Sequence, residues 1–133
     1  MIVGYSGYLF ICDTSAIKDC IKNKTFSCPI DAAKIAQKIG RGSVIFLYNP
    51  ESTVLVGPFT VTDSTMKLEP GAWITDTEHD FPTKFGVEWE EVHQVKDAPK
   101  EFPFLSEKKS CALTETQTQR LFHVLMSSPL FEP

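Results

Sequence analysis

Long hydrophobic runs are absent from this 133-residue sequence. The longest apolar run extends from Ser43 to Tyr48, whereas a helix that spans a membrane needs about 20 apolar residues. No basic stretch precedes an apolar one near the N-terminus, so no targeting segment is expected. The 42% hydrophobic and 23% charged residues are globular values and exclude disorder, collagen and coiled coil. We expect a soluble, cytoplasmic protein with one domain over residues 1–133.

Metal-binding patterns are also missing. The four cysteines, Cys12, Cys20, Cys28 and Cys111, include no C-x-x-C pair, and the three histidines share no ligand spacing with them. We therefore expect no metal and no cofactor. A chain of this length has enough core without disulfides, so the cysteines are expected to be reduced, mostly buried thiols of a cytosolic protein.

A net positive charge is lacking as well. The formal charge is −4, which argues against a protein that holds nucleic acid mainly by neutralising phosphates. The charges are nevertheless segregated, because residues 18–41 carry six basic and two acidic residues and residues 69–107 carry ten acidic residues and three lysines. This pattern fits either a face that orients a polyanion or an ordinary solvated surface.

Catalytic patterns are incomplete. Gly4-Tyr5-Ser6-Gly7 is not a G-x-S-x-G motif and precedes the first predicted strand. Residues 40–43 (Gly-Arg-Gly-Ser) lack the Lys-Ser/Thr and the helix of a phosphate loop, and the glutamates at 88, 90 and 91 are expected to be solvated. We therefore expect a protein that is not an enzyme, and a small hydrolase is the weakest of the functional hypotheses.

The first half of the chain predicts a strand, two helices and a second strand. The apolar run 8–12 predicts a buried strand, and Asp13, Thr14 and Ser15 are good N-cap residues for a helix with an apolar stripe at 17, 20 and 21. Residues 25–29 predict a break before a helix over 31–39, which Gly40 ends. The run 44–48 predicts the next strand.

The second half predicts a hairpin, a long loop, a strand and a final helix. Residues 53–62 pair with 44–48, with an edge or a bulge near Pro58. Residues 63–82 form a long polar loop, 84–95 alternate as a strand, and 98–104 are irregular. A capping box at Thr114 and Gln117 begins a helix with an apolar stripe at 121, 122, 125 and 126 that packs on the sheet. The class is α+β with a mostly antiparallel, curled sheet.

Three aromatic residues stand in polar surroundings. Phe26, Trp73 and Phe81 fall outside the predicted strands, among neighbours such as Thr25, Ser27 and Asp80. Large flat side chains in polar loops either cap the core or serve as stacking platforms for a ligand. Both interpretations stay open at this point.

Several segments, taken in order, carry a resemblance to a known superfamily. Residues 8–11 (Tyr-Leu-Phe-Ile) with the polar turn 13–15 are similar to the opening F-x-I-K-S strand of YTH domains, and 22–29 are similar to a helix end followed by Trp or Phe, a small residue, any residue and Pro. Residues 44–59 resemble a hairpin with G-x-F in its second strand, and 85–89 followed by 95–99 resemble F-x-V-x-W and V-x-D-V-P. Over residues 8–128 the chain thus resembles the PUA-like branch that contains the YTH, DCD and EVE domains.

The resemblance implies a curled mixed β-sheet, or pseudo-barrel, flanked by helices, and a specific ligand. In YTH domains an aromatic cage holds a methylated adenine of single-stranded RNA, and the matching positions here are Phe26, Trp73 and Phe81, the last standing eight residues before Trp89. The other expected contacts are to the base edge and backbone (Asp13, Thr14, Ser15, Ser27, Cys28) and to phosphates (Lys18, Lys22, Lys24, Arg41). An N6-methyladenine reader that acts as a monomer follows as the first hypothesis.

The sequence departs from the YTH pattern at two places. Phe26 stands where YTH domains have Trp, a feature shared with the DCD segment L-F-G-L-P, and Cys12 replaces the lysine after the first strand. The pattern Leu113-Thr114-x-x-Gln117 and the pair 81–82 (Phe-Pro) are also more similar to DCD domains. The second hypothesis is therefore a DCD-like module of stress response that binds a protein or a small ligand without nucleic acid.

Overall fold

The computed structural model describes residues 7–28, 35, 39–65, 83–107 and 109–131. The elements follow the chain in this order: β1 (Gly7–Ile11), α1 (Thr14–Asn23), β2 (Thr25–Cys28), β3 (Val44–Asn49), β4 (Val54–Thr65), β5 (Thr83–Glu88), β6 (His93–Val95), α3 (Ala98–Glu101), the 3-10 helix η3 (Pro103–Glu107), β7 (Cys111–Leu113) and α4 (Glu115–Met126). None of the helices in these ranges is long and apolar enough to cross a membrane.

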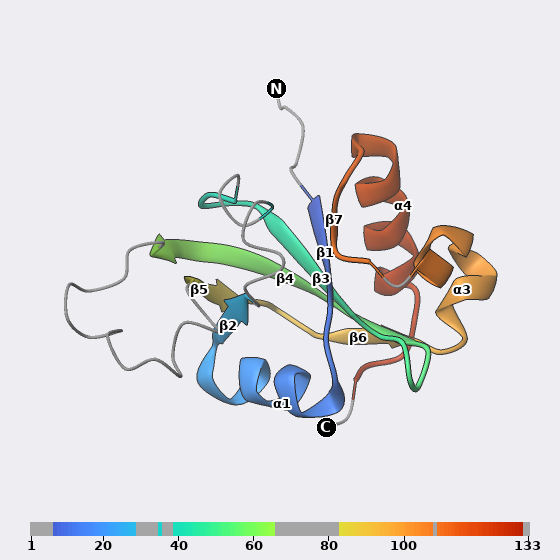
Figure 1. The fold of residues 1–133 in the computed structure, drawn as a ribbon, viewed down its shortest axis with the longest axis horizontal. Coiled ribbons are helices and arrows are strands. Elements are labelled where there is room, and N and C mark those ends of the chain that lie inside the picture. Colours follow the sequence, from blue (N-terminus) through green and yellow to red (C-terminus); the bar gives the residue numbers. More distant parts are fainter. Residues whose placement is uncertain (1–6, 29–34, 36–38, 66–82, 108, 132–133) are drawn as a thin grey trace.

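The strands form one seven-stranded open sheet. Its order is β2-β5-β4-β3-β1-β7, and β6 pairs with β4 beside β5. β1 and β3 are parallel, whereas the other pairs are antiparallel. Figure 1 shows α1 on one side of the curled sheet and α3 and α4 on the other. The arrangement confirms the α+β class and the mostly antiparallel, curled sheet.

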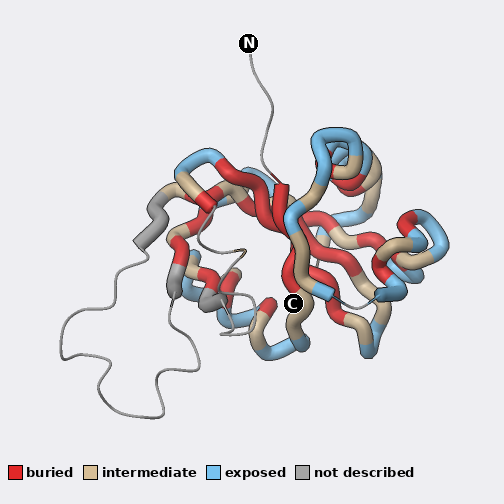
Figure 2. Tube along the Cα trace, turned by 45° about the horizontal axis from the view of Figure 1, so that its top comes forward, coloured by how far each residue is buried: buried red, intermediate tan, exposed pale blue. Residues whose placement is uncertain are grey.

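Both faces of the sheet are buried, and the alternation along the strands divides the core in two. On β1, Tyr8 and Phe10 pack with α1, whereas Leu9 packs with α3, η3 and α4. On β3, Leu47 packs on the α1 side of the sheet and Phe46 packs on the α4 side. The central strands are therefore almost wholly buried, as Figure 2 shows. We call the two sides the α1 face and the α4 face.

Local sequence signals fix both long helices. Asp13 is the N-cap of α1, and its carboxylate accepts a hydrogen bond from the Ala16 amide at 2.8 Å. α4 begins with the predicted capping box, in which Thr114 Oγ1 accepts from the Gln117 amide and Gln117 Oε1 accepts from the Thr114 amide. α4 also approaches β1 closely, since a Cβ on Gly7 would lie within 3.0 Å of three side-chain atoms of Thr118.

β4 changes its pairing partner at a bulge. The register against β3 shifts at Gly57-Pro58, opposite Phe46, which confirms the bulge predicted near Pro58. Before the bulge, residues 55–57 pair with β6, and after it, residues 60–65 pair with β5. β4 is thus a central strand, not an edge.

Some predicted elements differ from those observed. Residues 25–28, expected as a break, form β2, because the extended backbone favoured before a proline finds a partner in β5. The predicted strand 84–95 is two strands, β5 and β6, because the chain leaves the sheet after Glu88 and bends at Glu90. Residues 98–107 are helical instead of irregular, and β7 was not anticipated. The helix expected over 31–39 and the loop expected over 63–82 lie mostly outside the described residues, but residues 63–65 belong to β4 instead of the loop, because they pair with β5.

The apolar stripe of α4 is narrower than predicted. Leu121 and Leu125 are buried against the sheet, whereas Phe122 and Met126 are 44% and 45% exposed. The side of the helix that meets the sheet therefore holds one i, i+4 pair of large side chains. The prediction that α4 packs on the sheet is confirmed.

Candidate functional site

The segment with the predicted cage residues attaches at one end of the sheet. The connection 66–82 leaves β4 after Thr65, which pairs with Lys84, and rejoins the chain at Thr83, which pairs with Cys28 of β2. The Thr83 end therefore adjoins β2, the strand that carries Phe26, whereas the Thr65 end lies on β4, one strand further away across β5. Trp73 and Phe81 themselves lie outside the described residues, so their roles stay predictions.

Phe26 lies in the core of the α1 face. It is 2% exposed, and its ring packs on Phe10 with centroids 4.9 Å apart and planes tilted by 48°. Such an aromatic pair stabilises the region where α1 meets the sheet. A cage wall also has to present one ring face to the base. The role of Phe26 as a wall therefore stays a prediction beside its observed packing role.

The polar turn 13–15 forms the N-terminus of α1. Asp13 caps the helix, Thr14 Oγ1 accepts a hydrogen bond from Asn49 Nδ2 at 2.9 Å, and Ser15 is exposed. The buried Asn49 also accepts from the Glu51 amide at 2.9 Å, so it ties α1 to the β3–β4 turn. The ten residues of α1 span about 15 Å at 1.5 Å per residue, and they separate this turn from β2.

The other residues predicted to contact the base edge lie in β2. Ser27 pairs with Lys84, and Cys28 pairs with Thr83. The structure describes only the backbone of Ser27 and Cys28. The structure thus brings the backbone of these two residues beside the end of the 66–82 connection. It places the turn 13–15 at the opposite end of α1.

The four predicted phosphate-binding residues are exposed. Lys18 and Lys22 are spaced i, i+4 on α1 and share one side of that helix. The Lys24 carbonyl accepts a hydrogen bond from the Val87 amide of β5, and Val87 pairs with Val61 of β4. Val61 in turn hydrogen-bonds to the backbone of Gly42 and Ser43 in the turn before β3. Three interstrand steps of about 4.8 Å separate Lys24 from this turn, which contains Arg41. Lys24 and Arg41 therefore lie in one row across the sheet.

The described cysteines are poor nucleophiles. Burial raises the pKa of the Cys20 thiol from 9.0 to about 12. The pKa of Cys12 is also raised, chiefly by burial and further by the nearby Cys20 and Asp13. Because the thiolate is the reactive form, both thiols are inert near neutral pH. Among the described residues, no group of three or more His, Cys, Asp or Glu side chains could hold a metal ion.

A shallow pocket of about 200 Å³ lies on the α1 face and was not predicted from the sequence. Its lining residues come from α1, the bend between β5 and β6, and the C-terminal segment: Ile21, Trp89, Glu91, Val92, Leu130 and Phe131. The sequence places Phe131 about 40 residues from Val92, so no local pattern could connect them. The tryptophan at the end of an alternating run, followed by two glutamates, is the one signal that could have indicated a bend.

Comparisons with known proteins agree on one fold. Residues 6–125 match the model of the family described as the development and cell death domain. The structure is similar to a Toxoplasma CPSF4-YTH domain in apo form, with a TM-score of 0.69, 14% identity, and coverage of 97% of this chain and 90% of that one. It is also similar to the YTH domain of the protein mmi1 in complex with RNA, with a TM-score of 0.68, 12% identity, and coverage of 92% and 82%.

A third similar structure is a complex with modified RNA. It is the YTH domain of Zygosaccharomyces rouxii MRB1 with N6-methyladenosine RNA, with a TM-score of 0.64, 14% identity, and coverage of 98% of this chain and 94% of that one. At such identities the similarity shows the fold alone. A sequence search of curated proteins found no match.

Proposed function

The chain belongs to the development and cell death domain family and has the fold of YTH domains, and from that fold we propose that it is an RNA-binding module. In this proposal the domain reads a modified base of single-stranded RNA, of the N6-methyladenine kind. Two of the similar YTH domains were solved with RNA or with N6-methyladenosine RNA. Single strands, unlike duplexes, present a base that can be splayed into a pocket.

The observation that carries the proposal is the position of the 66–82 connection. Its C-terminal end joins Thr83, which pairs with Cys28, two residues after Phe26 in β2, and its N-terminal end leaves Thr65 on β4, one strand further across the sheet. Lys24 and Arg41 are exposed and lie in one row across the sheet, level with Val87, about 13 Å along β5 from Thr83. Aromatic residues beside exposed cations form the combination that single-strand binders use for bases and phosphates.

The energetics indicate how such a cage discriminates. Stacking a base on an aromatic side chain contributes about 1–3 kcal/mol. Burying one extra methyl adds only about 0.8 kcal/mol, or roughly a four-fold preference. A sharper selectivity has to come from the fit of the pocket and from hydrogen bonds to the base edge, which we assign to Ser27 and Cys28. Asp13, Thr14 and Ser15, at the other end of α1, are assigned to the RNA backbone.

Substitution of Trp73 tests the proposal. Trp73→Ala is expected to weaken binding of a short single-stranded RNA that carries N6-methyladenine by at least about five-fold, which corresponds to the loss of about 1 kcal/mol of stacking. The melting temperature should stay within a few degrees of the original. Fluorescence anisotropy and thermal unfolding measure the two quantities.

The matched control is Phe122→Ala, which removes an exposed aromatic side chain from α4 on the opposite face. It should leave the RNA affinity unchanged. Unchanged RNA binding by Trp73→Ala would contradict the proposal. A large fall in its melting temperature would instead assign Trp73 to core packing.

A second candidate is a module that binds a protein or a small ligand and no nucleic acid. The family match and the formal charge of −4 favour this alternative. The two candidates differ in one simple observation. If no oligonucleotide binds at any salt concentration, the protein-binding candidate replaces the RNA reader.

A further inference from the structure

The shallow pocket on the α1 face is held open by well-anchored walls. Trp89 packs edge-on against Phe59, with ring centroids 5.4 Å apart and planes at 88°. The opposite wall is the C-terminal segment, which hydrogen-bonds to the chain around β6: the Phe131 amide donates to Val92 O at 2.7 Å, and the Gln94 amide donates to Pro129 O at 2.9 Å. A buried ring nitrogen of His93, Nδ1, lies 2.8 Å from Ser128 O and anchors the same segment. The pocket is therefore largely preformed.

The pocket is separate from the proposed RNA site. Trp89 follows the last residue of β5, whereas the 66–82 connection joins the first residue of that strand. Six residues of extended chain at about 3.3 Å each place Trp89 about 20 Å from Thr83. A ligand at Trp89 therefore lies about 20 Å from a base held where the connection rejoins β5, and closer to Lys24, whose carbonyl accepts from the Val87 amide.

The chemistry of the lining favours a cation. Ile21, Val92, Leu130 and Phe131 are apolar, and Glu91 supplies a carboxylate that is 61% exposed and whose Oε1 lies 3.6 Å from Nε2 of His93. Lys22 follows Ile21 in the sequence, and the Lys24 carbonyl accepts a hydrogen bond from Val87, but neither lysine lines the pocket. Among the described residues, the lining holds a carboxylate and no Lys or Arg, so it favours a positive charge. The indole ring of tryptophan is also the best aromatic partner for a cation.

The size of the pocket limits the ligand to one side chain. At about 200 Å³ it is smaller than the roughly 300–1,000 Å³ of pockets that hold small molecules. A guanidinium group is planar, so it can stack on an indole while its N–H groups bind a carboxylate. We propose that this pocket binds an arginine side chain of a partner protein, stacked on Trp89 and paired with Glu91. The exposed Leu130 at the rim contacts an apolar neighbour of that arginine.

Peptide binding tests the proposal on the full chain. The probe is a short blocked peptide with one arginine between two leucines, and its partner peptide carries citrulline, which keeps the shape and removes the charge. NMR titration follows the indole N–H of Trp89. We expect the arginine peptide to shift this resonance at saturable concentrations and the citrulline peptide to bind at least ten-fold more weakly.

A pair of glutamate variants tests the role of the carboxylate. Glu91→Gln should lower the affinity for the arginine peptide by about ten-fold. The matched variant Glu90→Gln, at an exposed carboxylate outside the lining, should change this affinity by less than two-fold. Both side chains are exposed, so both variants should fold.

Three results would overturn the proposal. The first is an unshifted Trp89 resonance with both peptides. The second is equal binding of the arginine and citrulline peptides. The third is a shift of Trp89 by a short single-stranded RNA that competes with the peptide, because this result would make the pocket part of the RNA site.

Discussion

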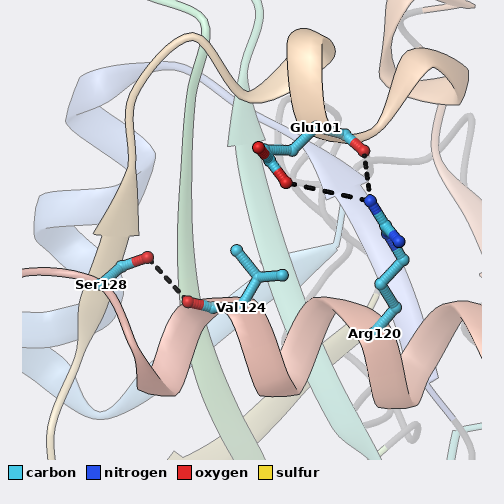
Figure 3. Close-up of polar contacts among 4 residues, drawn as sticks. All are labelled: Glu101, Arg120, Val124 and Ser128. Atoms are coloured by element: carbon cyan, nitrogen blue, oxygen red, sulfur yellow. Dashed lines mark hydrogen bonds and ion pairs between the residues drawn. The ribbon is translucent and has the colours of Figure 1, made fainter.

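The two faces of the sheet use their polar groups in different ways. On the α4 face, polar side chains bind within the chain: Arg120 Nη2 donates to the Glu101 carbonyl at 3.2 Å and lies 3.8 Å from its carboxylate, and Ser128 Oγ donates to Val124 O at 2.7 Å (Figure 3). The guanidinium of Arg120 also lies 5.5 Å from the centre of the Phe102 ring.

On the α1 face, exposed groups surround the core instead. Lys18, Lys22 and Lys24 point to solvent, and Trp89 lines a pocket with the exposed Glu91. Both faces hold a buried core cluster, so both stabilise the fold. The difference is that the proposed binding residues and the Trp89 pocket all lie on the α1 face or at the edge of the sheet beside it, which leaves the α4 face as the internal control.

The close approach of β1 and α4 offers the strongest way to separate stability from binding. Gly7→Ala adds a Cβ that collides with Thr118, and such overpacking costs about 1–3 kcal/mol. Urea unfolding should show this loss, while the folded variant keeps the RNA affinity of the original. Thr118→Ala in the same chain should restore part of the stability. If Gly7→Ala weakens RNA binding of the folded protein, the faces are not independent.

The buried thiol on the α1 face predicts a stability that depends on pH. Because the pKa of Cys20 is about 12 in the folded chain and 9.0 ordinarily, the unfolded chain loses this proton first as the pH rises. The contribution of Cys20 to the free energy of unfolding should be constant well below pH 9 and be lost progressively between pH 9 and 12, with a loss of about 1 kcal/mol at pH 10.

The control is the variant Cys20→Ala. Between pH 8 and pH 10, it should lose about 1 kcal/mol less stability than the original protein loses. Urea unfolding at the two pH values provides the comparison. Equal losses in the two proteins would show that Cys20 is not the group responsible.

Replacing a single exposed lysine should have the smallest effect on RNA binding. Lys24→Gln is expected to weaken RNA binding a few-fold and to reduce the slope of log affinity against log salt by about 0.7, the value for one phosphate contact of a single strand. The matched variant Lys100→Gln removes an exposed lysine from α3 on the α4 side and should change neither quantity. An equal slope change in both variants would indicate a general charge effect instead of a defined phosphate contact.

Local signals could be predicted from the sequence, and long-range pairings could not. The cap at Asp13, the capping box at Thr114 and the bulge near Pro58 depend on a few adjacent residues, and all three were predicted. β2 and β7 are short strands whose formation depends on distant partners, β5 and β1. The interruption between β5 and β6 occurs where Trp89 packs against Phe59, thirty residues away, a contact that no local pattern indicates, and so the strand 84–95 was predicted without interruption.

The candidate sites divide in the same way. The basic residues of α1 and the capping turn 13–15 could be found from spacing and residue type. The pocket at Trp89 could not, because one wall is the C-terminal segment that returns to β6. The burial of Phe26 against Phe10 likewise depends on where α1 places β2.

The most direct test compares two short single-stranded RNAs that differ by one methyl group. Fluorescence anisotropy at two salt concentrations should show tighter binding of the strand with N6-methyladenine than of its unmethylated twin, by about four-fold or more, and the preference should survive the higher salt. Equal and weak binding of both strands that disappears at higher salt, or no binding of either, would contradict the account of an RNA reader.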